Sequence, residues 1–371
     1  MRCPFCSSLD TKRKGKTRGA PARFHDPLRP LQRFLCKTCG RSFTFARCKA
    51  RPRARFADDV VQEAVQIYVE GLTPYRALAR LLETRLGQPV SARTLNRWVD
   101  DVGARAKTPL QVSIELRPRW GGFLGVDGKA IFIAGVKHWL LIGVDHPSHD
   151  IVHHLIASVE NGDSYAQLVT EARLDAAYPL LGVVADLGNG FVDAHRDHFG
   201  SVPFQACRIH FDRRLNSEIP WLPRSPGAAL AAELRARIRS VLYAPTYADA
   251  CELLYDLHLD RKNYAAVHRH RDSLRSLLRT SGLYMSHHFA PGLPPDNNTT
   301  ENVIKQLNKK LRLMEGFATR DSADHFLRLL IGAYRFKRFT DSCRPEANGQ
   351  APLGSAGIDL SERDWLTFLL E

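Results

Sequence analysis

A chain of 371 residues has room for two or three domains, and 44% apolar-class with 25% charged residues is typical of a globular protein rather than a disordered one. The 53 Lys and Arg against 39 Asp and Glu give a formal net charge of +14, which favours a polyanionic partner, nucleic acid first and an anionic membrane surface second. No apolar run of about 18 residues is present, so we expect no membrane-spanning helix. The first residues lack the apolar core of a signal peptide, so we expect a cytoplasmic protein whose eight cysteines are not a disulfide framework.

Four cysteines near the N-terminus have the spacing of metal ligands. They are Cys3, Cys6, Cys36 and Cys39. Two residues between thiolates let both reach one ion from a tight turn, and four thiolates complete a tetrahedral Zn²⁺ site. A redox C-x-x-C is the alternative for either pair, but it needs a thioredoxin-like setting that is absent here. We therefore predict a zinc ribbon, with a basic loop at 11–23 that suits phosphate contact or solvent equally.

Three helical segments follow, at 58–71, 73–87 and 91–105. Thr73 is the expected N-cap of the second segment, with Pro74 at its first helical position, and Ser91 is the expected N-cap of the third. This arrangement predicts a helix-turn-helix domain or, as the alternative, a three-helix structural or dimerisation module.

The third segment has the pattern of a recognition helix. Arg93, Asn96 and Arg97 lie near its start, while Leu95, Trp98 and Val102 fall on the opposite face. The early turns of a recognition helix meet base edges in the major groove. Arg93, Asn96 and Arg97 are therefore the predicted base-reading residues.

Asp127 interrupts an otherwise strand-like apolar and glycine run at 122–134. Burying an unpaired carboxylate costs several kcal/mol or forces it to take up a proton. Asp127–Gly128 is also a strong hairpin signal, so a turn is one interpretation and a metal-binding carboxylate is the other.

Two further acids have similar ambiguity. Asp186 ends an apolar strand before a glycine-rich turn, where α/β sheets bind ligands, but it also suits a helix N-cap. Glu301 is either the second member of a capping box that begins at Asn298, or a metal ligand beside a basic helix face that carries Lys305, Lys309 and Lys310.

The order of these three acids resembles that of the DDE transposases, in particular the Mutator-like transposases of bacterial insertion sequences. Cys207-Arg208-Ile209-His210 is similar to the C-x-x-H element that follows the second acid in that group, and 299–330 is similar to the region around its final Glu. The resemblance covers roughly residues 120–340. It implies an α/β fold with a ribonuclease-H-like catalytic core, here with an all-α insertion suggested by the helical patterns between Asn216 and Ala290.

The predicted organisation is a zinc ribbon at 1–50, a helix-turn-helix domain at 51–108, a core in two parts at 109–215 and 291–342, an all-α insertion at 216–290 and a tail at 343–371. The amphipathic end of the tail suits docking on the core or on a second subunit.

The resemblance also implies the chemistry. Asp127, Asp186 and Glu301 would hold two Mg²⁺ ions, or Mn²⁺ in their place, for cleavage and strand transfer at terminal inverted repeats. Cys207 and His210 supply only two ligands, so we expect them near the site rather than on a metal. Lys305 and Lys309 are expected to contact DNA.

The expected partners are the terminal repeats, the target DNA and further copies of the chain, on the nucleoid of a prokaryotic cell. Two other functions stay open: a non-catalytic DNA-binding regulator, and a ribonuclease-H-like nuclease without strand transfer.

Overall fold

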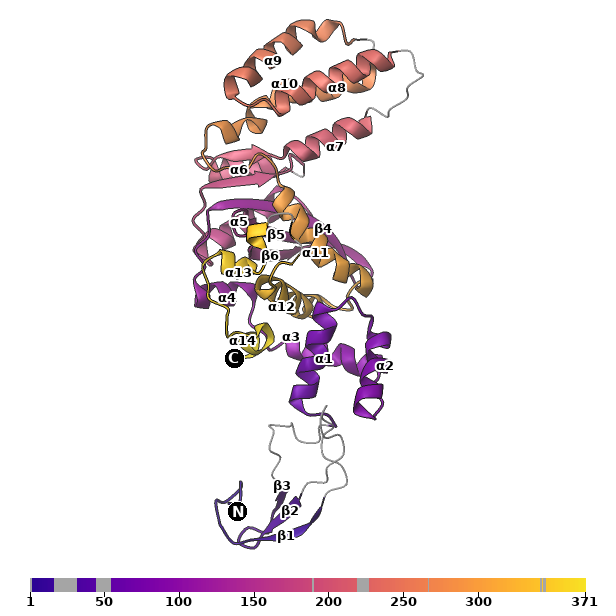
Figure 1. Ribbon diagram of the computed structural model, residues 1–371, viewed down its shortest axis with the longest axis vertical. Helices are drawn as coiled ribbons and strands as arrows, with labels where there is room; N and C mark the ends of the chain where they lie inside the picture. Colours follow the sequence, from indigo (N-terminus) through magenta and orange to yellow (C-terminus); the bar gives the residue numbers. More distant parts are fainter. Residues whose placement is uncertain are drawn as a thin grey trace.

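The structure is a computed structural model that describes residues 2–16, 32–44, 55–188, 190–218, 227–265, 267–340, 342 and 345–371. A mixed sheet lies in the middle of an elongated molecule, with helices α8–α10 toward one end and a small N-terminal sheet at the other (Figure 1). Within the described ranges, no helix has the length and apolar character needed to cross a bilayer.

The N-terminal sheet is antiparallel, in the order β1 (Thr11–Lys16), β2 (Gln32–Cys36) and β3 (Ser42–Thr44). Its small core consists of two buried cysteines and Phe43, whose ring stacks on Phe34. The first part of the predicted basic loop is therefore strand β1, because it pairs with β2. Residues 17–23 of that loop lie outside the described ranges.

Three helices follow: α1 (Asp58–Glu70), α2 (Tyr75–Leu86) and α3 (Ala92–Gly103). Ser91 caps α3 as predicted, and its hydroxyl accepts a hydrogen bond from Thr94 N at 3.0 Å. The predicted start of α2 is wrong by one residue: Pro74 is the N-cap, with ψ 153°, and Thr73 makes no cap.

The central sheet has the order β6-β5-β4-β7-β8, so that β4 is the middle strand. Its strands are β4 (Phe123–Ile133), β5 (Val136–Asp145), β6 (Ile151–Ala157), β7 (Gly182–Ala185) and β8 (Phe204–Ala206). β4, β5 and β6 are antiparallel neighbours, whereas β7 runs parallel to both β4 and β8. This is a mixed α/β fold.

The hairpin between β4 and β5 turns at Ala134 and Gly135, not at Asp127–Gly128. Both turn residues have positive φ, +51° and +78°, as a two-residue hairpin of the I′ kind requires. Asp127 instead pairs with Ile142 in the middle of the ladder. The turn interpretation of Asp127 is therefore wrong.

Helices cover both faces of the central sheet. One face packs with α5 (Gly162–Leu174) and α6 (Phe191–Phe199), through residues such as Leu124 and Val126. The other packs with α11 (Asn298–Met314) and α12 (Arg320–Phe336), through residues such as Ile131. Side chains alternate between the two faces along a strand, so Asp127 lies on the same face as Ile131, the face covered by α11.

The three-helix module shares its core with the α12 side of the sheet. α3 lies so close to α12 that a Cβ on Gly103 would come within 2.3 Å of His325 O. At the C-terminus, α14 (Trp365–Leu370) docks on the same helix, with Leu369 against Gly332 and the Phe368 ring 5.6 Å from that of Phe336. The amphipathic end of the tail is therefore docked on the core, one of its two predicted destinations.

The described residues between β8 and α11 are mainly helical, as the sequence pattern predicts. They include α7 (Arg208–Glu218), α8 (Ala228–Leu242), α9 (Tyr247–Leu259) and α10 (His268–Tyr284), with short 3-10 turns at Asp260–Lys262 and Ser286–His288. The remaining short elements are α4 (Pro109–Leu116), a 3-10 turn at Pro345–Ala347 and α13 (Pro352–Ser355).

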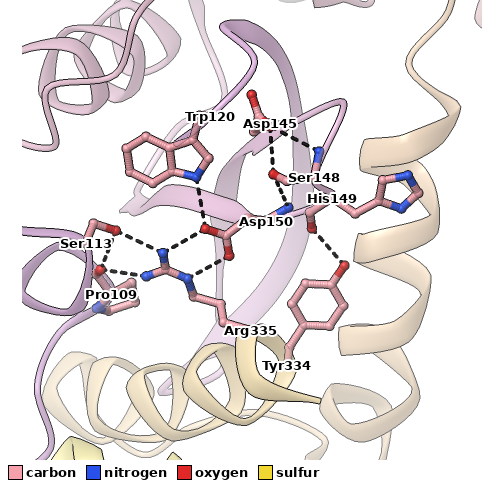
Figure 2. Close-up of polar contacts among 9 residues, drawn as sticks. All are labelled: Pro109, Ser113, Trp120, Asp145, Ser148, His149, Asp150, Tyr334 and Arg335. Carbon is pink, nitrogen blue, oxygen red and sulfur yellow. Dashed lines mark hydrogen bonds and ion pairs between the residues drawn. The ribbon is translucent and has the colours of Figure 1, made fainter. Parts of the chain in front are cut away.

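A buried ion pair joins α12 to the sheet and to α4 (Figure 2). Arg335 and Asp150 are both fully buried, and two guanidinium nitrogens donate to the carboxylate at 2.8 Å each. Arg335 also donates to Pro109 O and Ser113 Oγ, while Trp120 Nε1 donates to Asp150 at 3.0 Å. Because these contacts satisfy both charges, the pair is tolerated in the core.

Candidate active site

Asp127 is a largely buried carboxylate on the middle strand. Its Oδ1 accepts a hydrogen bond from Gly128 N at 2.8 Å. Burial raises the pKa of Asp127 to about 6, and the neighbouring Glu301 and Glu160 charges act in the same direction. The Gly128 N–H and His210 oppose this rise only in part. Asp127 is therefore a carboxyl group whose burial favours the protonated form.

Asp186 lies directly after β7, beside Asp127 in the register of the sheet. The parallel pairing runs from Phe123↔Gly182 to Gly125↔Val184, and continuing this register past the end of β7 places Asp186 level with Asp127. Neighbouring strands are about 4.8 Å apart. Asp186 is exposed, and its Oδ1 accepts a hydrogen bond from Leu187 N. The two acids therefore lie side by side at the C-terminal end of β7.

Glu301 lies in the first turn of α11 and is buried. The capping-box interpretation is wrong, because the N-cap is Asn297 rather than Asn298. The Asn297 side chain donates to Val126 O in β4 at 2.8 Å instead of capping the helix. The Glu301 carboxylate pairs with Arg213 Nη2 at 2.6 Å.

Gly125 lets the start of α11 approach β4. A Cβ at this position would lie 2.1 Å from Thr300 Oγ1 and 2.5 Å from Asn297 Oδ1, so any larger residue would push the helix away. This contact brings Glu301 close enough to Asp127 to affect its pKa. The three acids, distant in sequence, are thereby gathered where β4, β7 and α11 meet.

Cys207 and His210 lie against the same helix. Buried Cys207 accepts a hydrogen bond from Asn297 N at 3.2 Å, and His210 Nδ1 is 3.6 Å from Glu301 Oε1. Interaction with the Cys207 side chain raises the pKa of His210 to about 9. One ligand atom from each of Cys207, His210 and Glu301 lies within 4.8 Å of the others. The fold thus gives the C-x-x-H pair a third donor that spacing alone did not supply.

Three residues at the site were not predicted from the sequence. Arg213 lies one helical turn after His210 and pairs with Glu301. Its position three residues after His210 puts it on the same face of α7, which is the one sequence signal that could have indicated it. Asn297 positions α11, and nothing local marks that role. Glu160 accepts a hydrogen bond from Tyr165 at 2.8 Å and lies beside Gly128, on the other face of β4 from Asp127.

The four N-terminal cysteines form a compact cluster. Cys3 and Cys39 have their sulfurs 3.7 Å apart, and Cys6 and Cys36 have theirs 3.6 Å apart. Zinc–sulfur bonds of about 2.3 Å in a tetrahedron put sulfurs roughly 3.8 Å apart. The cluster therefore fits a structural zinc ion.

The predicted base-reading residues share an exposed face of α3. Arg93, Asn96 and Arg97 are exposed, whereas Leu95, Trp98 and Val102 are buried as predicted. The three exposed residues border a groove of about 590 Å³, whose other wall includes the turn between α11 and α12.

The basic face of α11 is smaller than predicted. Lys305 and Lys309 are exposed, but Lys310 is buried, with its Nζ donating to Gly71 O at 2.8 Å and lying 3.5 Å from the centre of the Tyr68 ring. Burial lowers the pKa of Lys310 to about 8. Lys310 therefore joins α11 to the three-helix module and does not face solvent.

Comparison with protein families agrees with this arrangement. The family described as "Transposase, Mutator family" matches residues 40–336, a range that contains all three acids and the C-x-x-H element. The chain therefore belongs to the Mutator family of transposases. No curated protein sequence matches it.

Proposed function

We propose that this chain is a DNA transposase with a ribonuclease-H-like core, in which Asp127, Asp186 and Glu301 hold two Mg²⁺ ions for cleavage and strand transfer at terminal inverted repeats. The observation that carries the proposal is the meeting of the three acids: one on the middle strand, one after its parallel neighbour, and one on a helix held against that strand. The mixed sheet with its first acid on the central strand is the arrangement expected of such a core.

The residues fit hard divalent cations. Mg²⁺ prefers carboxylate oxygens and keeps several waters and phosphate oxygens. Among the described residues, Glu301 Oε1 is buried without a hydrogen-bond partner, and burial raises the pKa of Asp127 to about 6. A buried carboxylate oxygen without a hydrogen-bond partner, and a carboxylate whose charge is disfavoured by burial, are groups that a bound cation would stabilise. When bound, two such ions supply an activated attacking oxygen and stabilise the leaving one.

The chain's own groups would orient the DNA around these acids. Arg213 is half exposed beside Glu301 and could turn to a phosphate, and Lys305 and Lys309 face solvent on the same helix as Glu301. Phosphate contacts of this kind fix the position of a duplex without reading its sequence. We expect two or more copies to act together, since an element has two ends.

The test is a reaction of the purified protein with a labelled duplex that carries the flanking inverted repeat, in Mg²⁺. A transposase nicks the duplex at the repeat boundary and joins the freed end to target DNA. DNA that is bound but not cut would identify a non-catalytic DNA-binding regulator. DNA that is cut but not joined to target would identify a nuclease without strand transfer.

We further propose that α1–α3 are a helix-turn-helix domain that reads the repeat. An arginine bidentate to guanine contributes about 1–3 kcal/mol of discrimination. Arg93→Ala and Arg97→Ala should therefore reduce the preference for the repeat over unrelated DNA by about tenfold or more each. The measurement is a competition binding assay at fixed salt.

The matched control is Arg13→Ala, on the exposed face of β1. It should weaken binding to all sequences alike and lower the salt dependence, because a phosphate contact carries no sequence information. If Arg93→Ala and Arg97→Ala leave the preference unchanged, α3 is not the recognition helix.

The four-cysteine cluster is proposed to be a zinc ribbon that contributes to DNA binding. Cys36→Ser should release its zinc and unfold β1–β3, since a small zinc module folds around its metal. The central sheet has a separate core and should keep its secondary structure. Metal analysis together with circular dichroism checks both expectations, and a wild-type protein free of zinc after purification in zinc-containing medium would contradict them.

A further inference from the structure

The Cys207–His210–Glu301 cluster has a buried polar atom, His210 Nδ1, that the proposed chemistry does not account for. His210 Nδ1 and Glu301 Oε1 each lack a hydrogen-bond partner among the described residues, although the two atoms are 3.6 Å apart. The Glu301 side chain is only 7% exposed, so water does not readily satisfy its oxygen. Leaving such atoms unpaired is costly.

The other Glu301 oxygen has a partner. Oε2 pairs with Arg213 at 2.6 Å, which fixes the carboxylate so that Oε1 is directed toward His210 and Cys207. The Cys207 sulfur accepts one hydrogen bond, from Asn297 N, and lies within 4.8 Å of the other two ligand atoms. Three donors from β8–α7 and α11 therefore converge on one point.

Sulfur, imidazole nitrogen and a single carboxylate oxygen are the donors that Zn²⁺ prefers, and Mg²⁺ does not take thiolates. In a tetrahedral zinc site, donors at about 2.0–2.3 Å from the ion lie roughly 3.3–3.8 Å from one another. The His210–Glu301 separation already has this value, and Cys207 needs to move by about one ångström at most.

We propose that Cys207, His210 and Glu301 form a second zinc site, which leaves a fourth coordination position open and competes with the catalytic metals for Glu301. Zinc binding at the cluster stands independently of the catalytic proposal. The competition rests on the catalytic proposal, because Glu301 Oε1 would bind either the zinc ion or the paired magnesium ions, and not both. Occupation of the zinc site would then switch off DNA cleavage.

The binding test counts zinc in the full-length protein after equilibration with excess Zn²⁺ and removal of the free ion. The wild type and the control Cys251→Ser, a cysteine on α9 away from the cluster, should hold two Zn²⁺ per chain. Cys207→Ser and His210→Ala should each hold one. His210 is partly exposed, so its variant decides the matter if Cys207→Ser does not fold.

A spectroscopic arm identifies the ligand. Protein that keeps only the N-terminal zinc is titrated with Co²⁺, which should give a thiolate-to-cobalt charge-transfer absorption in the wild type and none in Cys207→Ser. One zinc per wild-type chain, or two per chain in the His210→Ala variant, would overturn the site.

The competition test compares cleavage with and without Zn²⁺ at constant Mg²⁺, as a ratio within each variant. Zinc should lower the cleavage rate of the wild type and of Cys251→Ser at least tenfold. It should lower the cleavage rate of His210→Ala by a much smaller factor. Equal inhibition of His210→Ala would overturn the competition and leave the catalytic proposal standing. If the wild type does not cleave even without zinc, the catalytic proposal fails, and the zinc count still decides the cluster.

Discussion

Asp127→Asn should lower Mg²⁺-dependent cleavage of an element end by at least about a thousandfold, while folding and end binding are retained. The amide keeps the shape of the side chain, and its oxygen still accepts the hydrogen bond from Gly128 N. It removes a charge that the paired ions need, and metal ions supply several kcal/mol of transition-state stabilisation, each 1.36 kcal/mol being tenfold in rate. Single-turnover cleavage of a labelled end measures the loss.

Asp186→Asn and Glu301→Gln should have effects of the same order, because each removes one carboxylate from the same group. Glu315→Gln is the matched control. Glu315 is the C-cap residue of α11; it is exposed and has φ +57°. It is not one of the three acids of the proposed active site. It should cleave like the wild type. Cleavage within about tenfold of wild type by Asp127→Asn or Glu301→Gln would remove that residue from the proposed active site.

Arg335→Met should lower the free energy of unfolding by about 3–5 kcal/mol, since it leaves the buried Asp150 charge without its partner. Among the described residues, Trp120 Nε1 alone would remain on that carboxylate. Ser113 Oγ and Pro109 O would each lose the hydrogen bond from Arg335, and Pro109 O would keep the one from the Ser113 hydroxyl (Figure 2). Because Arg335 joins α12 to α4 and to the loop after β5, the loss should affect the cooperative unit around the sheet. Urea denaturation followed by tryptophan fluorescence measures it.

Arg196→Met is the control for that change. Arg196 pairs with Asp193 at 3.0 Å, but both side chains are largely exposed, and exposed pairs contribute 0–1 kcal/mol as a rule. A double variant that replaces both Arg335 and Asp150 by apolar residues should recover part of the lost stability, because no lone charge is then buried. If Arg335→Met and Arg196→Met unfold at the same urea concentration, the buried pair does not have the proposed role.

Features set by neighbouring residues could be predicted from the sequence. The C-x-x-C pairs and the Ser91 cap depend on a few adjacent positions, and the structure has both. The exposed and buried faces of α3 could be predicted too, because one helical period decides which residues are exposed. The family was accessible from the order of three acids and a C-x-x-H element.

The errors come from contacts between distant segments. Asp127–Gly128 has the local signature of a turn, but ten residues of β4 pair with β5, and this ladder determines the strand. Asn298 has the local signature of a cap, yet Asn297 takes the cap position and its side chain bonds to Val126, 171 positions away. Lys310 follows the pattern of a basic surface and is buried by a turn 239 positions away. The third donor at the C-x-x-H pair is likewise invisible in the sequence, because Glu301 reaches it only when α11 docks on β4.

The most direct test of the central claim is a joining reaction with an element end that has already been cut. Two ends are compared, one with a 3′-hydroxyl and one with a 3′-hydrogen, each with wild-type protein, target plasmid and Mg²⁺. If the 3′-hydroxyl of the end attacks target phosphate directly, the 3′-hydroxyl end gives joined product and the 3′-hydrogen end gives none. Asp127→Asn should give no joined product with either end. Target DNA that is broken equally with either end and never joined would contradict the account and identify a nuclease.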